Sequence, residues 1–216
     1  MTVPSDKSVR PDEPFDEPLD EPFDKSAAIA EVLACAPGVP TVFTTGFASR
    51  VAAALDDRPN HFYMTGSMGL ALSVGTGVAM GSGRTTVVVD GDGSLLMNPA
   101  TLLAVGADPD LPIVHVVLDD GVYASTGGQP TPGRRADLGG LAAASGYRTV
   151  REATTRPALR AALCSALAAD SAVFIRCPVQ PDAAPPGGRV TPDLPGVAAR
   201  FAGSVTGGSR FPAPPE

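Results

Sequence analysis

Two stretches of the chain carry the residue types that could do chemistry, 87–98 (VVVDGDGSLLMN) and 118–129 (LDDGVYASTGGQ). In the first, a run rich in β-branched residues stops at Gly91-Asp92-Gly93, and a segment compatible with a helix begins at Ser94. A strand, a tight turn and a helix in this order leave free backbone N–H groups beside a carboxylate at the carboxyl end of a buried strand. Open α/β sheets bind phosphorylated ligands at such places.

The second stretch supplies another carboxylate at a useful distance along the chain. Between Gly93 and Asp119 lie 25 residues, enough for one helix and one further strand. Asp120 would then follow the tip of the adjacent strand and face Asp92. Two hard oxygen ligands beside a helix N-terminus suit Mg²⁺ that carries a diphosphate.

Composition narrows the class of protein. The chain has 216 residues, enough for one core of ordinary size, and 44% of them are hydrophobic. Residues 1–25 hold −5 of the net charge of −7, so the remainder is near neutral and offers no basic surface for nucleic acid. The three cysteines are widely spaced and fit neither a disulfide framework nor a CxxC metal site. With no apolar leader and no apolar run of membrane-spanning length, we expect a cytoplasmic protein.

Both ends of the chain differ from its middle. Residues 12–23 read DEPF, DEPL and DEPF, and proline at every fourth position together with repelling acids predicts a disordered, acidic, Pro-rich tail over 1–25. In an alternative reading, the periodic Phe15, Leu19 and Phe23 dock on a partner. Residues 181–216 are rich in Pro and Gly and are expected to wrap the domain or fray. The domain itself is expected over 26–180.

Within that domain, strand-like and helix-like segments alternate, which predicts an α/β fold with an open, mostly parallel sheet flanked by helices on both faces. The expected strands cover 41–45, 61–64, 85–90, 113–118, 148–150 and 172–176, and the expected helices cover 27–36, 49–55, 70–80, 94–104, 138–145 and 157–169.

The glycines at 75, 77 and 81 suggest a dinucleotide fingerprint at first sight. That fingerprint follows a strand and opens a helix, whereas these glycines lie within and at the end of a predicted helix. Close packing of this helix on the sheet, with Gly81-Ser82-Gly83 as its stop, explains them better. Nicotinamide binding is therefore rejected.

Three motifs together, GSMGLALSVGTG from Gly66, DGDGSLLMN from Asp90 and LDDGVYASTGGQPT from Leu118, resemble a known family. They are similar to the thiamine-diphosphate (ThDP)-binding domain, C-terminal or β-subunit, of the phosphonopyruvate and sulfopyruvate decarboxylases. The resemblance runs over about 39–179 and implies the ThDP-binding fold. One departure stands out, because this chain has Asp119-Asp120 where the family usually has Asp-Asn.

The resemblance implies a set of cofactor-binding residues: Thr45, Gly46, Gly66, Ser67, Met68, Gly91, Asp92, Gly93, Ser94, Asp120, Val122, Tyr123, Ser125 and Thr126. It makes Asp92, Asp120 and the Val122 carbonyl the Mg²⁺ ligands. Met68 would be the apolar wedge that keeps thiamine bent, and the Gly66 carbonyl would accept from its 4′-amino group.

Asp120 adds one negative charge to this site. That charge could weaken diphosphate affinity or change the preferred ion, unless N–H groups or Arg134 and Arg135 compensate for it. Arg50 is interpreted either as a contact to a second anion of the substrate or as a solvated side chain behind a helix cap at Ser49.

His61 and His115 are interpreted as structural, because no carboxylate or nucleophile pairs with either in the sequence.

What is missing from the sequence matters as much. Enzymes of the family need a glutamate from a pyrimidine-binding domain, and no certain catalytic residue lies in this chain. Of its six glutamates, four are terminal (Glu13, Glu17, Glu21 and Glu216), and Glu31 and Glu152 lie outside the predicted site.

The resemblance therefore implies one subunit of a two-component, ThDP-dependent 2-oxoacid decarboxylase that is active only with an α subunit supplying the glutamate, in an α₂β₂ heterotetramer. The expected cofactors are ThDP and Mg²⁺, the expected substrate is a small 2-oxoacid, and neither nucleic acid nor membrane is an expected partner. The alternatives are a ThDP-dependent carboligase of the acyloin type and a non-catalytic ThDP-fold scaffold.

Overall fold

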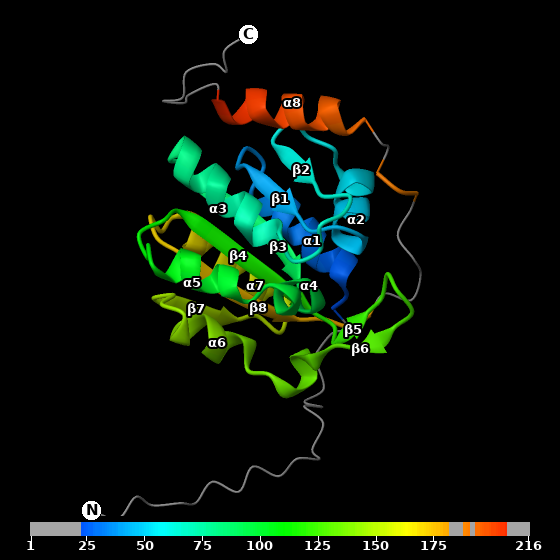
Figure 1. Ribbon diagram of the computed structural model, residues 1–216, viewed down its shortest axis with the longest axis vertical. Coiled ribbons are helices and arrows are strands. Elements are labelled where there is room, and N and C mark those ends of the chain that lie inside the picture. Colours follow the sequence, from blue (N-terminus) through cyan, green and yellow to red (C-terminus); the bar gives the residue numbers. More distant parts are fainter. Residues whose placement is uncertain (1–22, 182–187, 191–192, 207–216) are drawn as a thin grey trace, which may run out of the picture.

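The computed structural model describes residues 23–181, 188–190 and 193–206, which form a six-stranded sheet between two layers of helices (Figure 1). All neighbouring strands of this sheet are parallel, in the order β2-β1-β3-β4-β8-β7, which confirms the predicted fold. Its strands are β1 (Thr41–Phe43), β2 (His61–Tyr63), β3 (Thr86–Gly91), β4 (Ile113–Asp119), β7 (Thr149–Glu152) and β8 (Val173–Pro178).

The helices cover both faces of the sheet because the strands are apolar on both sides. On β3, for example, Val87 and Val89 pack into one core cluster and Val88 into the other. The first cluster lies under α1 (Lys25–Cys35), α2 (Phe47–Leu55) and α7 (Arg156–Leu167). The second lies under α3 (Ala71–Ser82), α4 (Asp92–Met97), α5 (Ala100–Gly106), α6 (Leu138–Ala144) and α8 (Leu194–Thr206).

The strand order creates a switch point between β1 and β3. From β1 the chain passes to β2 on one side, and then returns to place β3 on the other side. Connections that leave in opposite directions open a crevice at the carboxyl ends of the two strands, where ligands of open α/β sheets bind. β4 continues this edge, because Gly91 is paired with Leu118 and the next residues of both strands emerge together.

Three local features depart from the expectation. The helix expected over 94–104 is two helices, because Pro99 has no N–H to donate and α4 ends before it. The first of them starts at Asp92, two residues early. The segment after β4 forms an antiparallel pair, β5 (Val122–Tyr123) with β6 (Gln129–Pro130), followed by a short 3₁₀ helix, Pro132–Arg135.

The folded domain begins earlier than the composition indicates. Phe23, the last residue of the DEPF repeat, is 1% exposed and belongs to the core of this chain. Asp24 caps α1 by accepting a hydrogen bond from Ala27 N at 2.7 Å, and it pairs with Gln180 beyond the end of β8. Phe23, Asp24 and Lys25 are therefore part of the domain, although the composition places them in the tail. The remainder of the predicted tail lies outside the described residues.

Part of the C-terminal extension is a helix packed on the domain. α8 lies across the β2 edge of the sheet, beside α3 (Figure 1). The Phe201 ring lies 5.4 Å from that of Phe62, and Arg200 pairs with Asp57 at 2.7 Å. Within the described residues no helix has the length and apolarity needed to span a membrane, and the three cysteines are free thiols.

The glycines of α3 have the structural role that the sequence indicates. A Cβ added at Gly75 would lie 2.1 Å from Val88 Cγ2, so only glycine lets this helix approach β3 so closely. Gly83 ends the helix in the left-handed conformation, with φ of 63°. Gly75 therefore serves helix packing and Gly83 helix termination, as predicted, whereas Gly77 packs against nothing.

One packed glycine and one open glycine of α3 give a matched test. Gly75→Ala is expected to destabilise the fold by about 1–3 kcal/mol, because the stiff, β-branched Val88 cannot move aside. Gly77→Ala has nothing within 4 Å of its new Cβ and should instead stabilise the fold by about 0.5–1 kcal/mol, since alanine is the better helix former. Urea unfolding of both variants measures the difference, and equal stabilities would contradict the packing argument.

Candidate functional site

The hydroxyl of Ser94 joins three loops at the switch point. Ser94 lies in the first turn of α4, just after β3, and is 2% exposed. Its Oγ lies 2.9 Å from Oγ1 of Thr44, which follows β1, and it accepts a hydrogen bond from Gly69 N at 3.1 Å. The loops that carry the Thr-Thr-Gly, GSMG and GDGS motifs are thus fixed against one another.

The GSMG turn has an unusual backbone. Ser67 has φ of 56°, the only positive value for a non-glycine among the described residues, and Gly69 has φ of 93°. A Cβ at Gly69 would lie 3.1 Å from Met97 Cβ. The positive φ and this close contact both require glycine at the position. Met68 between them is half-buried and Gly66 is exposed. A strained turn of this kind is held in place by its surroundings and is typical of functional sites.

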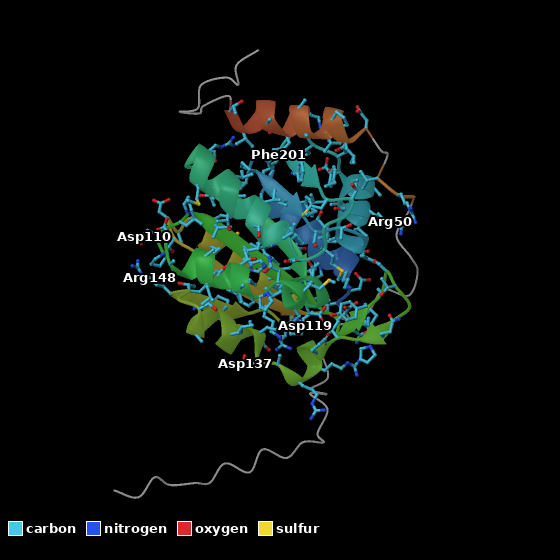
Figure 2. All side chains as sticks on the ribbon, in the orientation of Figure 1. Arg50, Asp110, Asp119, Asp137, Arg148 and Phe201 are labelled. Carbon is cyan, nitrogen blue, oxygen red and sulfur yellow. The ribbon has the colours of Figure 1, made fainter. Side chains whose placement is uncertain are left out.

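Three carboxylates are buried at the same edge of the sheet, those of Asp92, Asp119 and Asp120, with exposed fractions of 2%, 8% and 7%. Asp119 ends β4 and pairs with Arg176 of β8 at 2.7 Å. Asp119 lies on the side of the domain that carries β5 and β6, whereas Asp110, before β4, lies on the opposite side (Figure 2).

The other two carboxylates have partners from elsewhere in the chain. Oδ2 of Asp92 accepts a hydrogen bond from the Thr131 hydroxyl. Oδ2 of Asp120 pairs with the Lys25 ammonium, and its Oδ1 accepts a hydrogen bond from Val122 N at 3.3 Å. The second predicted metal ligand is therefore part of a buried ion pair.

The surroundings of Asp92 favour its neutral form. Burial raises its pKa from 3.8 to about 6, the charges of Asp119 and Asp120 act in the same direction, and the Thr131 hydrogen bond partly opposes them. The negative charges of Asp119 and Asp120 thus oppose the ionisation of Asp92. A divalent cation would relieve this repulsion, which is the electrostatic condition that a magnesium site requires.

The hairpin that follows β4 is placed against the two glycine turns. A Cβ at Gly93 would lie 2.4 Å from Tyr123 Cε1, and one at Gly46 would lie 2.7 Å from Ser125 Oγ. The glycines therefore allow Tyr123 and Ser125 to approach the ends of β3 and β1. Thr126 is exposed at the hairpin tip, and its hydroxyl lies 3.2 Å from Gln129 Oε1.

The donor set fits Mg²⁺ and a diphosphate. Two carboxylates, Asp92 and Asp120, occupy adjacent strand ends, and the first N–H groups of α4 have no acceptor within the helix. Among the described residues no three His, Cys, Asp or Glu side chains form a metal-binding group, so a cation here would complete its coordination with backbone oxygen or water. The contacts bring together Gly46, Ser94, Asp92, Gly93, Tyr123, Ser125, Asp120 and Val122 of the predicted set.

Four further residues belong to the surroundings of the site: Lys25, Thr44, Thr131 and Arg176. Thr131 ends the motif that begins at Leu118, and Thr44 directly precedes Thr45 of the predicted cofactor-binding set, so both positions were accessible from sequence. The composition places Lys25 in the acidic tail, and Arg176 lies inside an expected strand. Neither carries a local signal for this site.

Both histidines are buried within strands, and neither belongs to the predicted cofactor-binding set. The Nδ1 atom of His61 lies 3.1 Å from the Tyr63 hydroxyl, which donates to Asp57. Burial and the charge of Arg58 lower the pKa of His61 to about 4, so it is neutral at physiological pH. His115 is fully buried in β4, and its Nε2 lies 3.7 Å from Asp90 Oδ2. Each histidine therefore has a carboxylate nearby that sequence adjacency does not reveal.

The cap interpretation of Ser49 is wrong, because Ser49 lies inside α2. Its hydroxyl donates to the carbonyls of Phe43 and Thr44, and the cap position is Gly46.

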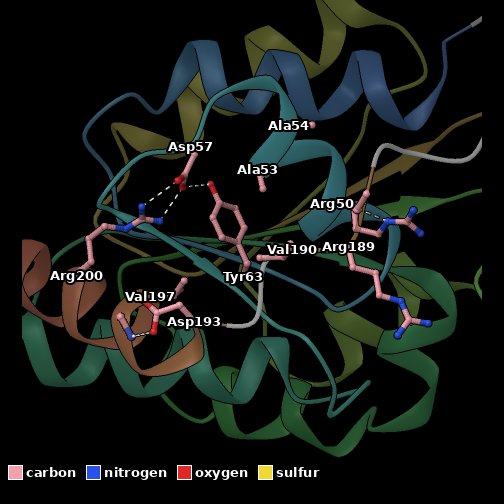
Figure 3. Close-up of a pocket in the computed structure, with 12 residues that line it drawn as sticks. Arg50, Ala53, Ala54, Asp57, Tyr63, Arg189, Val190, Asp193, Val197 and Arg200 are labelled. Carbon is pink, nitrogen blue, oxygen red and sulfur yellow. Dashed lines mark hydrogen bonds and ion pairs between the residues drawn. The ribbon is translucent and has the colours of Figure 1, made fainter.

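Arg50 lines a cavity of about 510 Å³ between α2, Tyr63 and the start of α8, and its Nε donates to Gly188 O at 3.4 Å (Figure 3). None of the predicted cofactor residues lines this cavity, so the two features are separate places on the domain.

A parallel sheet with a switch point and buried acids at two adjacent strand ends is typical of domains that bind phosphorylated ligands. The chain belongs to the family described as thiamine pyrophosphate enzyme, C-terminal TPP binding domain, whose model matches residues 44–177. The predicted family is thereby confirmed.

Individual relatives agree with this assignment. The chain is 46% identical over 183 residues to phosphonopyruvate decarboxylase of Streptomyces viridochromogenes, covering 83% of this chain and 46% of that protein. It is 42% identical over 136 residues to sulfopyruvate decarboxylase subunit beta of Methanothermobacter thermautotrophicus, covering 63% and 71%. Benzoylformate decarboxylase of Polynucleobacter necessarius shares the fold, with a TM-score of 0.64 at 19% identity over 74% of this chain and 33% of that one. The chain spans less than half the length of the phosphonopyruvate decarboxylases it matches.

The raised pKa of Asp92 predicts a pH-dependent effect on stability. Because the folded protein binds this proton more tightly than the unfolded chain, ionised Asp92 lowers stability above pH 6, and the loss disappears as the pH falls below about 4. Asp92→Asn should therefore be more stable than the wild type by up to roughly 3 kcal/mol at pH 8, and equally stable near pH 4.

Urea unfolding of the metal-free protein at several pH values measures this difference. Asp170→Asn, which changes an exposed carboxylate in the loop between α7 and β8, is the matched control and should leave the pH profile unchanged. A difference between Asp92→Asn and the wild type that did not vary with pH would contradict the assignment.

Proposed function

We propose that this chain is the diphosphate- and Mg²⁺-binding (β) subunit of a ThDP-dependent 2-oxoacid decarboxylase of the phosphonopyruvate and sulfopyruvate type. The burial of Asp92 and Asp120 side by side at the carboxyl edge, within a chain of this family, is the observation that carries the proposal. The similarity to phosphonopyruvate decarboxylase and to the sulfopyruvate decarboxylase subunit supports the reaction class.

In this proposal the chain binds the cofactor through its metal and diphosphate. Asp92 and Asp120 bind Mg²⁺ through carboxylate oxygens, and Val122 binds it through its carbonyl. Backbone N–H groups of Gly93 and Ser94 donate to the diphosphate, because the first turn of a helix leaves these donors free. Bound ThDP supplies the electron sink for loss of CO₂ from a 2-oxoacid.

The remaining predicted residues orient the cofactor. Thr45, Gly46, Gly91, Tyr123, Ser125 and Thr126 surround its diphosphate end, and Gly66, Ser67 and Met68 lie under its middle. The fixed GSMG turn supports this role, since its strained backbone is held by the Gly69 N–H to Ser94 hydrogen bond. The half-buried Met68 side chain is then available as the apolar wedge.

A second chain completes the site in this proposal. The two glutamates within the described residues are already engaged, Glu31 by Arg156 and Arg160, and Glu152 by Arg176. An α subunit would supply the catalytic glutamate, in an α₂β₂ assembly in the cytoplasm. The β-subunit name of the sulfopyruvate decarboxylase relative supports a two-chain organisation.

The surface around the site also favours a covering partner. Leu70 and Met97, next to the GSMG turn, are 42% and 60% exposed. Large apolar side chains beside a functional site are typical of surfaces that another chain covers.

The reaction can be tested with the two-chain enzyme. Co-purified with a pyrimidine-domain partner, ThDP and Mg²⁺, the wild type is expected to release CO₂ from 3-phosphonopyruvate or 3-sulfopyruvate and to form an aldehyde. Asp92→Ala should lower kcat/KM at least about a hundredfold, because it removes a metal ligand. Asp110→Asn, at the opposite end of β4, is the control and should retain activity.

Other outcomes separate the alternatives. Accumulation of an acyloin product from added aldehyde would identify a carboligase. Failure of the two-chain complex to bind ThDP at any Mg²⁺ concentration would contradict the proposal of a ThDP-dependent enzyme. The non-catalytic scaffold would then be the remaining alternative.

A further inference from the structure

The carboxyl edge of the sheet carries more negative charge than a single buried region normally tolerates. Asp92, Asp119 and Asp120 are each less than 10% exposed, and like charges in a buried region repel strongly. Asp119 is neutralised by Arg176 at 2.7 Å. Asp120 is the acid that stands where the family usually has an amide, so its charge is the one that needs a separate explanation.

Lys25 supplies the opposite charge. It is the first residue of α1, is only 9% exposed, and its ammonium contacts Oδ2 of Asp120, whose side chain is 1% exposed. The ammonium also lies 5.4 Å from the centre of the Phe47 ring, a favourable position for a cation.

The position of Lys25 is fixed on both sides. The preceding Phe23 is anchored in the core, and its carbonyl accepts a hydrogen bond from Gln180 N at 2.9 Å. Asp24 caps α1 through Ala27 N. These contacts place the beginning of α1 beside the carboxyl end of β8, so Lys25 reaches Asp120 from a held backbone.

The ion pair leaves Asp120 with the properties of an amide ligand. One carboxylate oxygen, Oδ2, is taken by Lys25, and Oδ1 stays available apart from a long hydrogen bond from Val122 N. A carboxylate paired in this way offers one oxygen and adds no net charge, as an asparagine side chain would.

On the basis of the proposed function, we propose that Lys25 is the charge-compensating residue of the metal site, and that Lys25 and Asp120 together replace the neutral amide ligand. Lys25 is a positioning residue that acts through Asp120. Without it, the extra negative charge would attract a divalent cation more strongly and repel the diphosphate.

A double-mutant cycle in the full chain tests this coupling. The variants are Lys25→Met, Asp120→Asn and the double substitution, with Lys25→Arg as the charge-conserving variant. Mn²⁺ binding without ThDP is followed by electron paramagnetic resonance, and ThDP binding at saturating Mg²⁺ is followed by calorimetry in the presence of the partner chain. Arg156→Met, which breaks a different ion pair of α1, that with Glu31, is the control for general loss of packing.

Lys25→Met is expected to tighten Mn²⁺ binding and to weaken ThDP binding, each by about tenfold, since one charge is removed next to the site. Lys25→Arg and the double substitution should stay within about threefold of the wild type for both ligands, because the net charge is restored. Arg156→Met should leave both affinities unchanged. Thermal unfolding identifies any variant that has lost its fold. If Lys25→Met is such a variant, the affinities of the double substitution still test whether Lys25 acts through Asp120.

A double substitution that keeps the changed affinities of Lys25→Met would overturn the proposal, as would a Lys25→Met variant whose affinities match those of the wild type. Suppose that the wild type binds Mn²⁺ but no ThDP, and that Lys25→Met tightens Mn²⁺ binding as expected. This result would contradict the proposed function but support the coupling between Lys25 and Asp120. Binding of neither ligand would overturn both.

Discussion

The burial of carboxylates at the ends of two adjacent parallel strands is the constraint on which the rest of this structure depends. The β3–β4 register brings Asp92 and Asp120 to the same edge, and neither has enough contact with water to be solvated there. An uncompensated buried charge is among the most destabilising features a fold can contain. Each acid therefore has a partner from a different element, Thr131 for Asp92, Arg176 for Asp119 and Lys25 for Asp120.

These partners also explain why the domain needs its outer segments. Arg176 belongs to β8, and Lys25 belongs to α1, whose first turn is held by Phe23 and Gln180. The edge is thus stabilised by parts of the chain far from the two motifs. Asp92 still keeps a raised pKa because burial and the neighbouring acids disfavour its charge, which a bound cation would stabilise.

Much of the fold was predictable because its signals are local. The β-branched strands, the glycine that ends α3, and the passage from strand to helix at Gly91–Asp92 depend on neighbours in sequence, and the structure contains all of them, although without the expected turn between β3 and α4. The split at Pro99 follows from a known property of proline and could have been foreseen. The family motifs likewise placed the candidate site at the carboxyl edge of the sheet, where the structure buries Asp92 and Asp120.

What the sequence could not reveal depends on contacts between distant residues. Phe23 belongs to the acidic repeat by sequence, yet its side chain is buried among core residues that only the folded sheet brings together. The partner of Asp120 could not be identified for the same reason, because Lys25 is 95 positions away and Arg134 and Arg135 lie much closer in sequence. The helix at 194–206 packs through Phe201 and Val205 on the β2 edge, in a region whose Pro and Gly content indicates none.

The central claim is that the edge formed by Asp92 and Asp120 binds a divalent cation and, through it, a diphosphate. Anomalous scattering from crystals of the two-chain complex grown with Mn²⁺ and ThDP tests it most directly. The account predicts a single Mn²⁺ peak between the carboxylates of Asp92 and Asp120, with the diphosphate phosphorus atoms next to Gly93 and Ser94. A Mn²⁺ peak elsewhere, or ThDP bound without contact to Asp92, would contradict it.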